Sequence, residues 1–120
     1  MGINKYNLSG MAASVPIVVG EVASPGTTIH TAPSADNGTD NVWIYAHNTG
    51  SATVNLTMQY GTVDAGEGTP SGSNFIMGIP AQAGLTLVSP GLVFESGSIV
   101  RAFAAHSGSI FLTGYVNRVT

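Results

Sequence analysis

The chain has 120 residues, which fits one domain, and only 8% of them are Asp, Glu, Lys or Arg, about a third of the usual share. It contains three basic residues, six acidic residues and no cysteine. Disulfides, thiolate catalysis and cysteine metal ligands are thereby excluded, and nucleic-acid binding is disfavoured because it needs clustered Lys and Arg. A surface with so few charges favours a protein that works inside an assembly over a free enzyme.

The first 14 residues are polar and show no periodicity, so we expect an extended N-terminal arm over residues 1–14 and a single domain over residues 15–120. No stretch is long and apolar enough for a membrane span or has the form of a cleavable leader, and we expect a soluble, unprocessed protein. Residues 15–22 contain Pro16 and are typical of an edge strand, and residues 27–31 form a second short strand candidate.

Two alternating runs follow, at residues 42–47 and 54–60, on either side of a turn at residues 48–51. Strands joined so closely are predicted to form a hairpin. The second run carries polar residues on one face, which predicts an antiparallel sheet with solvent on that side. These polar residues are Asn55, Thr57 and Gln59.

The glycine-rich residues 61–73 form the one long predicted loop, a place where a variable contact is expected. Further strand candidates follow at residues 75–79, 85–88, 92–94, 99–105 and 110–119, and the last two are predicted to form a second hairpin. The final strand has large apolar groups on both faces, which is typical of a central strand or an interface. The pattern predicts an all-β antiparallel β-sandwich, jelly-roll or immunoglobulin-like, with about eight strands.

The three histidines, His30, His47 and His106, lack the spacing that presents two imidazoles to one metal ion. His47, at a strand end, and His106, in a tight turn, are interpreted as surface or rim side chains that bond to backbone. No serine lies in a nucleophile elbow, and no glycine-rich loop precedes a lysine. We therefore predict no catalytic residue, no cofactor-binding residue, no metal ligand and no small-molecule substrate.

Two pairs of acidic residues lie in predicted loops, namely Asp36 with Asp40 and Asp64 with Glu67. Oxygen-rich loops of this kind can bind calcium, but neither pair matches a calcium-loop pattern. The favoured interpretation is that these carboxylates are turn residues that bond to their own backbone.

Four aromatic residues are candidates for an interface, namely Trp43, Tyr45, Phe111 and Tyr115. Aromatic side chains in strands are commonly buried in a core or in a subunit interface. A sugar-stacking platform is the alternative interpretation of Trp43 and Tyr45.

The strand and turn pattern of residues 41–119, about two thirds of the chain, resembles the small β-sandwich proteins of tailed-bacteriophage virions. The likeness lies in the N-T-G-S turn at residues 48–51, the I-P-A-Q-A-G-L-T-L run at residues 79–87, the G-L-V-F run at residues 91–94 and the glycine-interrupted strand that ends at Val119.

This resemblance implies a virion structural protein without enzymatic activity, most simply a capsid cement or decoration protein on the capsid surface. Its expected partners are the major capsid protein and two further copies of the chain in a homotrimer, with no nucleic acid and no membrane. The N-terminal arm or the 61–73 loop would then reach neighbouring capsid subunits. A tail, connector or fibre component and a carbohydrate-binding module are the alternatives.

Overall fold

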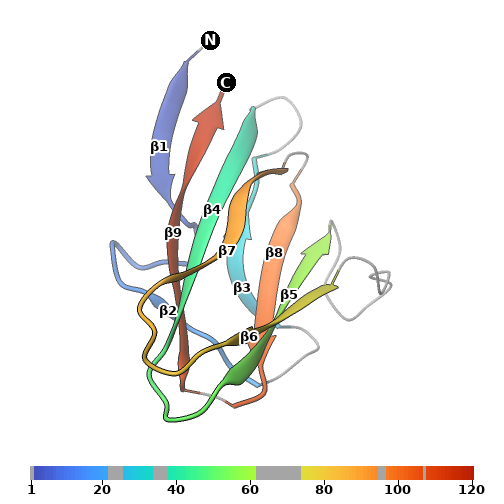
Figure 1. Cartoon of the computed structure of the whole chain (residues 1–120). Helices are drawn as coiled ribbons and strands as arrows, with labels where there is room; N and C mark the ends of the chain where they lie inside the picture. Colours follow the sequence, from blue (N-terminus) through green and yellow to red (C-terminus); the bar gives the residue numbers. More distant parts are fainter. Residues whose placement is uncertain (1, 22–25, 34–37, 62–73, 95–96, 107) are drawn as a thin grey trace.

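The structure, a computed structural model, describes residues 2–21, 26–33, 38–61, 74–94, 97–106 and 108–120. In these residues the chain forms nine β-strands, arranged in two antiparallel sheets that pack face to face (Figure 1). The predicted all-β sandwich is confirmed. Among the residues placed by the structure, no helix has the length and apolar character of a membrane span.

The first sheet, called sheet 1, has the strand order β1–β9–β4–β7. These strands are β1 (Ile3–Asn7), β9 (Ile110–Val119), β4 (Thr39–Asn48) and β7 (Thr86–Phe94). The short strand β2 (Ile17–Val18) pairs with the beginning of β9, on the same edge as β1. Strand β9 is thus paired on both edges, as expected for a strand with two apolar faces.

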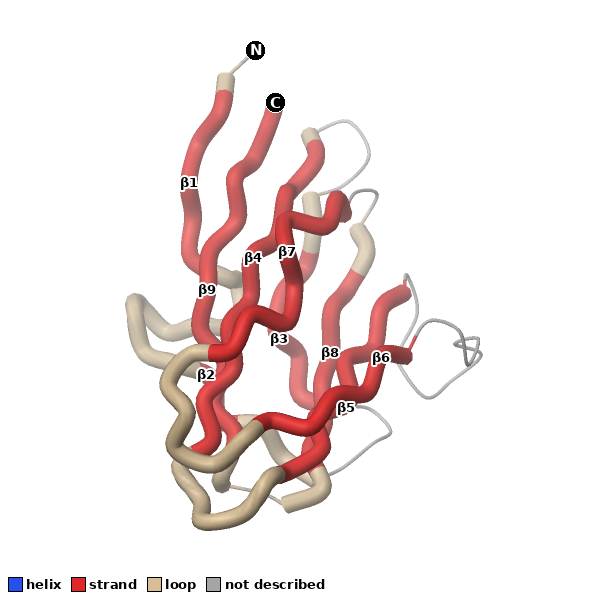
Figure 2. Tube along the Cα trace, in the orientation of Figure 1, coloured by secondary structure: helices blue, strands red, loops and turns tan. Residues whose placement is uncertain are grey.

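The second sheet, called sheet 2, has the order β3–β8–β5–β6. It contains β3 (Thr27–Thr31), β8 (Ile99–Ala104), β5 (Val54–Gly61) and β6 (Asn74–Ile79). Figure 2 shows the two layers of strands with the loops gathered mainly at their ends.

The core between the sheets follows from the two-residue period of the strands, because every second side chain of a strand points to the same face. In β4 the even-numbered residues are buried and the odd-numbered ones are half-buried on the outside. The largest fully buried apolar side chains come from both sheets and from the segments that follow β1 and β2; they are Leu8, Val19, Ile29, Val42, Ile44, Leu56, Met58, Ile79, Val100, Ile110 and Leu112.

Both predicted hairpins are wrong. Strands β4 and β5 lie in different sheets, as do β8 and β9, so each short connection crosses the sandwich. The Asn48 side chain holds the first crossing: its amide donates to the carbonyls of Ala52 and Ile79, and its Oδ1 accepts from the N–H of Gly50. A strand with one apolar face can bury that face equally well in either sheet, so alternation does not specify the neighbour.

The predicted wet face of β5 is also wrong in part, because Thr57 and Gln59 are buried while Asn55 is exposed. Strand β5 lies between β8 and β6, so its outward side chains have neighbours on both sides. Gly26 lies against Gln59 so closely that a Cβ at residue 26 would be 2.6 Å from Gln59 Oε1.

The N-terminal residues form part of sheet 1. Residues 3–7 pair with β9 as strand β1. The next residue, Leu8, places its large apolar side chain between the sheets, where it is buried in the core. Of the arm expected over residues 1–14, residues 3–7 are extended and lie along the sandwich, whereas residues 9–14 form turns. The two candidate strands at residues 85–88 and 92–94 are one strand, β7, with two irregularities in its pairing. Residues 62–73 of the predicted loop lie outside the described residues.

Candidate functional site

The four predicted interface residues come together on the outer face of sheet 1. Trp43 and Tyr45 project from β4, and Phe111 and Tyr115 project from β9, which pairs with β4. The rings of Trp43 and Tyr115 are stacked, with centroids 6.3 Å apart and planes inclined by 16°. Sequence reasoning thus identified residues that share one surface although two strands contribute them.

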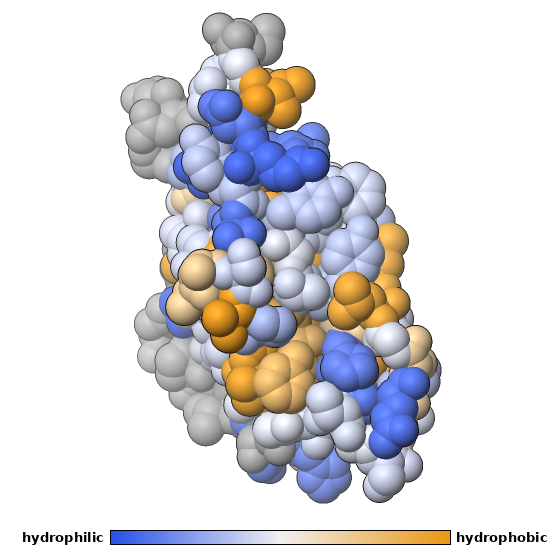
Figure 3. All heavy atoms as spheres, turned by 90° about the vertical axis from the view of Figure 1, so that its left-hand side faces the viewer, coloured by the Kyte–Doolittle hydropathy of each residue, from blue (hydrophilic) through white to orange (hydrophobic). Residues whose placement is uncertain are grey.

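Exposed aliphatic side chains extend this surface. Leu87 and Val93 of β7 pair with β4 residues on the same side, and Val18 of β2 pairs with Phe111. Val93 and Leu85 are each 61% exposed. We call the whole surface the outer face; it consists of Val18, Trp43, Tyr45, Leu85, Leu87, Val93, Phe111 and Tyr115. Figure 3 shows this side of the molecule, where apolar groups gather over the middle and lower parts.

Two hollows lie on the outer face. The larger one, called the groove, has a volume of about 570 Å³ and is open to one side; it is lined by Lys5, Tyr6, Asn7, Tyr45, Thr113, Gly114 and Tyr115. The smaller one, of about 280 Å³, is lined by Pro16, His47, Thr49, Leu85, Phe111 and Thr113. Thr113 lies between the two hollows and belongs to both.

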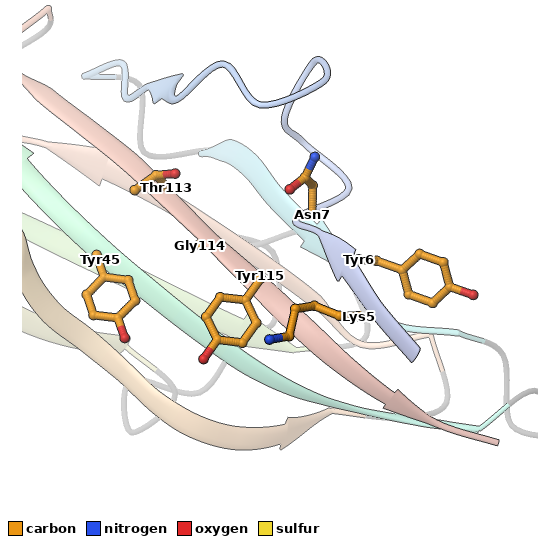
Figure 4. Close-up of a pocket in the computed structure, with 7 residues that line it drawn as sticks. All are labelled: Lys5, Tyr6, Asn7, Tyr45, Thr113, Gly114 and Tyr115. Atoms are coloured by element: carbon orange, nitrogen blue, oxygen red, sulfur yellow. The ribbon is translucent and has the colours of Figure 1, made fainter. Parts of the chain in front are cut away.

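The groove combines residues of β1 with residues of the β4–β9 pair (Figure 4). The Lys5 ammonium lies 4.9 Å from the centroid of the Tyr115 ring, a cation–π contact. Figure 4 shows the rings of Tyr45 and Tyr115 on the same side of the sheet, while Tyr6 points away from them. The outer face therefore offers aromatic rings, aliphatic side chains and one positive charge from Lys5.

Gly91 shapes the outer face beneath the indole of Trp43. Its φ is +79°, a conformation that side chains with a Cβ rarely adopt, and a Cβ there would lie 2.8 Å from Trp43 Cζ2. Gly91 lies where the pairing of β7 with β4 shifts between Leu92 and Pro90. The indole thus occupies the space that a side chain at residue 91 would need.

A cluster of polar and charged side chains lies inside the sandwich, and the sequence analysis did not predict it. Asp40, His30 and Arg118 meet at one end of the core, with Asp40 and His30 almost fully buried. We call these three residues the buried polar cluster. The interpretation of Asp40 as a turn residue is wrong, because Asp40 is buried in β4 and bonds to His30 and Arg118.

The sequence signal that could have predicted the cluster is parity, that is, whether a residue has an odd or an even position in its strand, because parity determines the face to which its side chain points. Asp40 has the same parity as the buried residues Val42 and Ile44, and Arg118 has the same parity as Leu112 and Val116. Residues that share parity in one strand point to the same face, so both charges are placed on the core side. A charge in such a position requires an opposite charge nearby.

The hydrogen bonds of the cluster define its protonation. Arg118 donates from Nε and a terminal nitrogen to the two carboxylate oxygens of Asp40, at 2.7 and 3.0 Å. The backbone N–H of Ser9 donates to His30 Nδ1 at 3.0 Å, so the ring proton is on Nε2, which donates to Asp40 Oδ2 at 2.6 Å. His30 is neutral in this arrangement.

The pKa values respond accordingly. Burial lowers the pKa of His30, and this effect outweighs the hydrogen bond and charge of Asp40. Burial by itself would raise the pKa of Asp40, but the hydrogen bonds from Arg118 and His30 lower it overall. At the same end of the core, burial raises the pKa of Tyr60 to about 12, where its ring stacks on Phe94, the strand partner of Asp40.

The hydrogen bonds of the buried polar cluster indicate a structural role. Both ring nitrogens of His30 are used, one by the Ser9 backbone and one by Asp40, and Ser9 Oγ accepts a hydrogen bond from the backbone N–H of Thr31. His30 is therefore not oriented to take a proton from the Ser9 hydroxyl, which general-base activation would require.

The remaining titratable candidates are dispersed. His47 lines the smaller hollow and His106 is exposed. Asp36, Asp64 and Glu67 lie outside the described residues. Within the described ranges, no three His, Asp or Glu side chains gather as a metal site would require.

Comparison with known proteins adds no relative: no protein-family model, no curated protein and no solved structure matches the chain.

Proposed function

We propose that the chain is a structural protein of a bacteriophage particle, of the capsid cement or decoration type, which self-associates through the outer face of sheet 1. The observation that carries the self-association is the gathering of exposed aliphatic and half-buried aromatic side chains on that face. Surfaces of this composition are typical of interfaces between proteins, where aromatic residues are enriched and charges are few.

The phage assignment is supported by the strand and turn resemblance of residues 41–119. In this proposal three copies bury their outer faces against one another, and other surfaces of the trimer bind the major capsid protein. The protein has no catalytic role and works on the capsid surface, where added contacts between shell subunits stabilise the shell.

Self-association is tested by the absolute mass of the purified protein, measured by light scattering or native mass spectrometry with and without EDTA. We expect three times the mass of one chain in both conditions, because the outer face offers apolar contacts and not metal ligands. A Leu85→Asp, Val93→Asp variant should be monomeric, since both side chains are 61% exposed and their replacement places charges in the contact.

The control is Ile76→Asp, which places one negative charge, against two in the outer-face variant, on the outward side of β6 in sheet 2, where Ile76 is 68% exposed. This variant should keep the mass of the wild type. A wild-type monomer, or dissociation by the control and not by the outer-face variant, would contradict the proposed contact. Sedimentation with capsids of the same virus then tests the cement role, and an assembled protein that does not bind them contradicts that role.

A carbohydrate-binding module is the second candidate, favoured by the groove, where Tyr45 and Tyr115 lie beside Lys5, Asn7 and Thr113. Aromatic rings flanked by hydrogen-bonding side chains can stack on sugars and bind their hydroxyl groups. A glycan array distinguishes the two candidates: binding by the wild type that is lost in a Trp43→Ala, Tyr45→Ala variant would support this function over assembly.

A further inference from the structure

Strand β1 is attached to the sandwich in an unusual way. All five of its residues are exposed, and it pairs only with the second half of β9. Ile3 is 72% exposed on one side of the strand, and Tyr6, whose ring centroid lies 4.9 Å from the Arg118 guanidinium, is 46% exposed on the other. An edge strand whose side chains are all exposed opens more readily than the body of the protein.

The next residue, Leu8, is only 1% exposed and is fixed in the core. The backbone after it is fastened as well: Ser9 N–H bonds to His30, and Gly10 N–H bonds to the carbonyl of Ile29. The chain is therefore firmly anchored from Leu8 onward, whereas β1 lies before this anchor. The junction between Asn7 and Leu8 is thus the point about which β1 can move relative to the body of the protein.

Strand β1 supplies hydrogen-bond partners for the backbone of one edge of β9. If β1 detaches, these N–H and C=O groups of β9 lose their partners. An exposed strand edge of this kind can pair with a strand from another chain. A second copy of β1 has the same sequence and makes the same hydrogen bonds. Exchange therefore costs little when copies are held close together, as in domain swapping.

We propose that the copies of this chain exchange β1, so that the β1 strand of each copy pairs with β9 of its neighbour. The inference rests on the self-association proposed above. It gives Ile3 and Tyr6 a surface of the neighbour to lie against. It also means that each groove is completed by another copy, because Lys5, Tyr6 and Asn7 line the groove together with Tyr45 and Tyr115.

The register provides a test, since the chain has no cysteine of its own. Gly2 and Thr120 exchange both backbone hydrogen bonds, at 3.3 and 3.0 Å. Hydrogen-bonded and non-bonded pairs alternate along an antiparallel ladder, so Lys5 and Asn117 form a non-bonded pair. The Cα atoms of such a pair are about 4.5 Å apart, within the range that a disulfide spans.

Lys5→Cys and Asn117→Cys are made in separate chains, which are unfolded together, refolded and oxidised. We expect a disulfide-linked pair of chains on a non-reducing gel. Asn41→Cys mixed with Asn117→Cys is the control, because Asn41 and Asn117 pair within the body of one chain, across β4 and β9, as a hydrogen-bonded pair with Cα atoms about 5.5 Å apart. The control mixture should give no linked pair, while the double variant N41C/N117C shows that this disulfide can form.

The double variant K5C/N117C separates this inference from the proposed function. Exchange predicts chains linked into a covalent oligomer with no free thiol. An oligomer of the expected mass whose chains migrate singly, with their thiols consumed, overturns the exchange and leaves self-association standing. A monomer in solution overturns both proposals, and free thiols after oxidation contradict the pairing of β1 on which the exchange depends.

Discussion

The buried polar cluster shows how single residues with charges can lie inside an apolar sandwich. Asp40 is fully buried, yet both of its oxygens accept hydrogen bonds, from Arg118 and His30. The cluster also joins the two sheets, because Asp40 and Arg118 belong to sheet 1 and His30 belongs to sheet 2. Replacing one member leaves the others buried without their partner, which costs more than the intact cluster contributes.

The first prediction concerns pH. The folded protein holds His30 neutral with a lowered pKa, whereas the unfolded chain protonates it below its ordinary pKa of 6.5. The free energy of unfolding should therefore fall as the pH drops below 6.5, and Asp40 should add a further loss below its ordinary pKa of 3.8. Urea midpoints between pH 8 and pH 3 measure both losses.

A His30→Gln variant should be less stable at pH 7 and should lose the decline that begins near pH 6.5. Replacement of the exposed His106 by Gln is the control and should keep the wild-type profile. A wild-type stability that stays constant from pH 7 to pH 4.5 would show that His30 does not control the acid response.

The second prediction concerns Gly91 and Trp43. Gly91→Ala forces a Cβ into a positive φ and against the indole, and we expect a loss of about 2 kcal/mol from the free energy of unfolding. Because Trp43 is the only tryptophan of the chain, its fluorescence should also shift. Urea unfolding followed by fluorescence gives both values.

Gly84→Ala is the matched control, since Gly84 has a similar φ of +76° but an added Cβ there has no neighbour within 4 Å. It should show the smaller loss and no change in Trp43 fluorescence. Equal effects of the two substitutions would mean that contact with the indole does not matter.

Among the strands, the edge strands and the crossings between sheets decide the architecture. Strands β4 and β9 pair over their whole length and carry the outer face, whereas β1 and β2 share one edge of β9. The crossing after β4 is held by the buried amide of Asn48, which makes three hydrogen bonds within the turn and to Ile79. Polar bonds of this kind specify a connection that apolar burial leaves open.

The third prediction compares β1 with its anchor. Leu8→Ala removes a fully buried side chain and should lower the free energy of unfolding by about 3 kcal/mol. The described residues of the segment before it, 2–7, are all exposed, so deletion of residues 1–7 should cost less than half as much. Urea unfolding of both variants at low protein concentration checks the ratio. A deletion that costs more than Leu8→Ala would show that β1 stabilises the body of the protein.

For the whole molecule, the scarcity of charge determines how copies can meet. With nine charged residues in 120, the chain cannot depend on ion pairs for association, and its outer face is formed mainly by aromatic and aliphatic groups. The described part of the molecule is elongated, with principal-axis extents of 45 × 30 × 22 Å.

The fourth prediction follows from this composition. Association through apolar contact should be nearly insensitive to salt, so the oligomer dissociation constant should change less than about threefold between 0.05 and 0.5 M NaCl. Sedimentation at several protein concentrations measures the constant. A tenfold weakening in high salt would indicate that charged groups outside the outer face form the contact.

The positions of the strands and the direction of their faces were predictable from the residues. The alternation at 42–47 and at 110–119 identified the strands that carry the outer face, and it placed Trp43, Tyr45, Phe111 and Tyr115 as interface candidates. The same alternation contained the buried polar cluster, because Asp40 and Arg118 have the parity of core residues, although the turn-like composition around residues 36–40 concealed it.

Strand partners were decided only in three dimensions. A two-residue period states which side of a strand is buried, but it is identical for a strand that pairs with its predecessor and for one that crosses the core to the other sheet. That choice depends on contacts between distant residues, such as Asn48 with Ile79 and Asp40 with Arg118. The crossings in place of hairpins, the burial of Gln59 and the place of β1 depend on such contacts, which no local pattern of residues encodes.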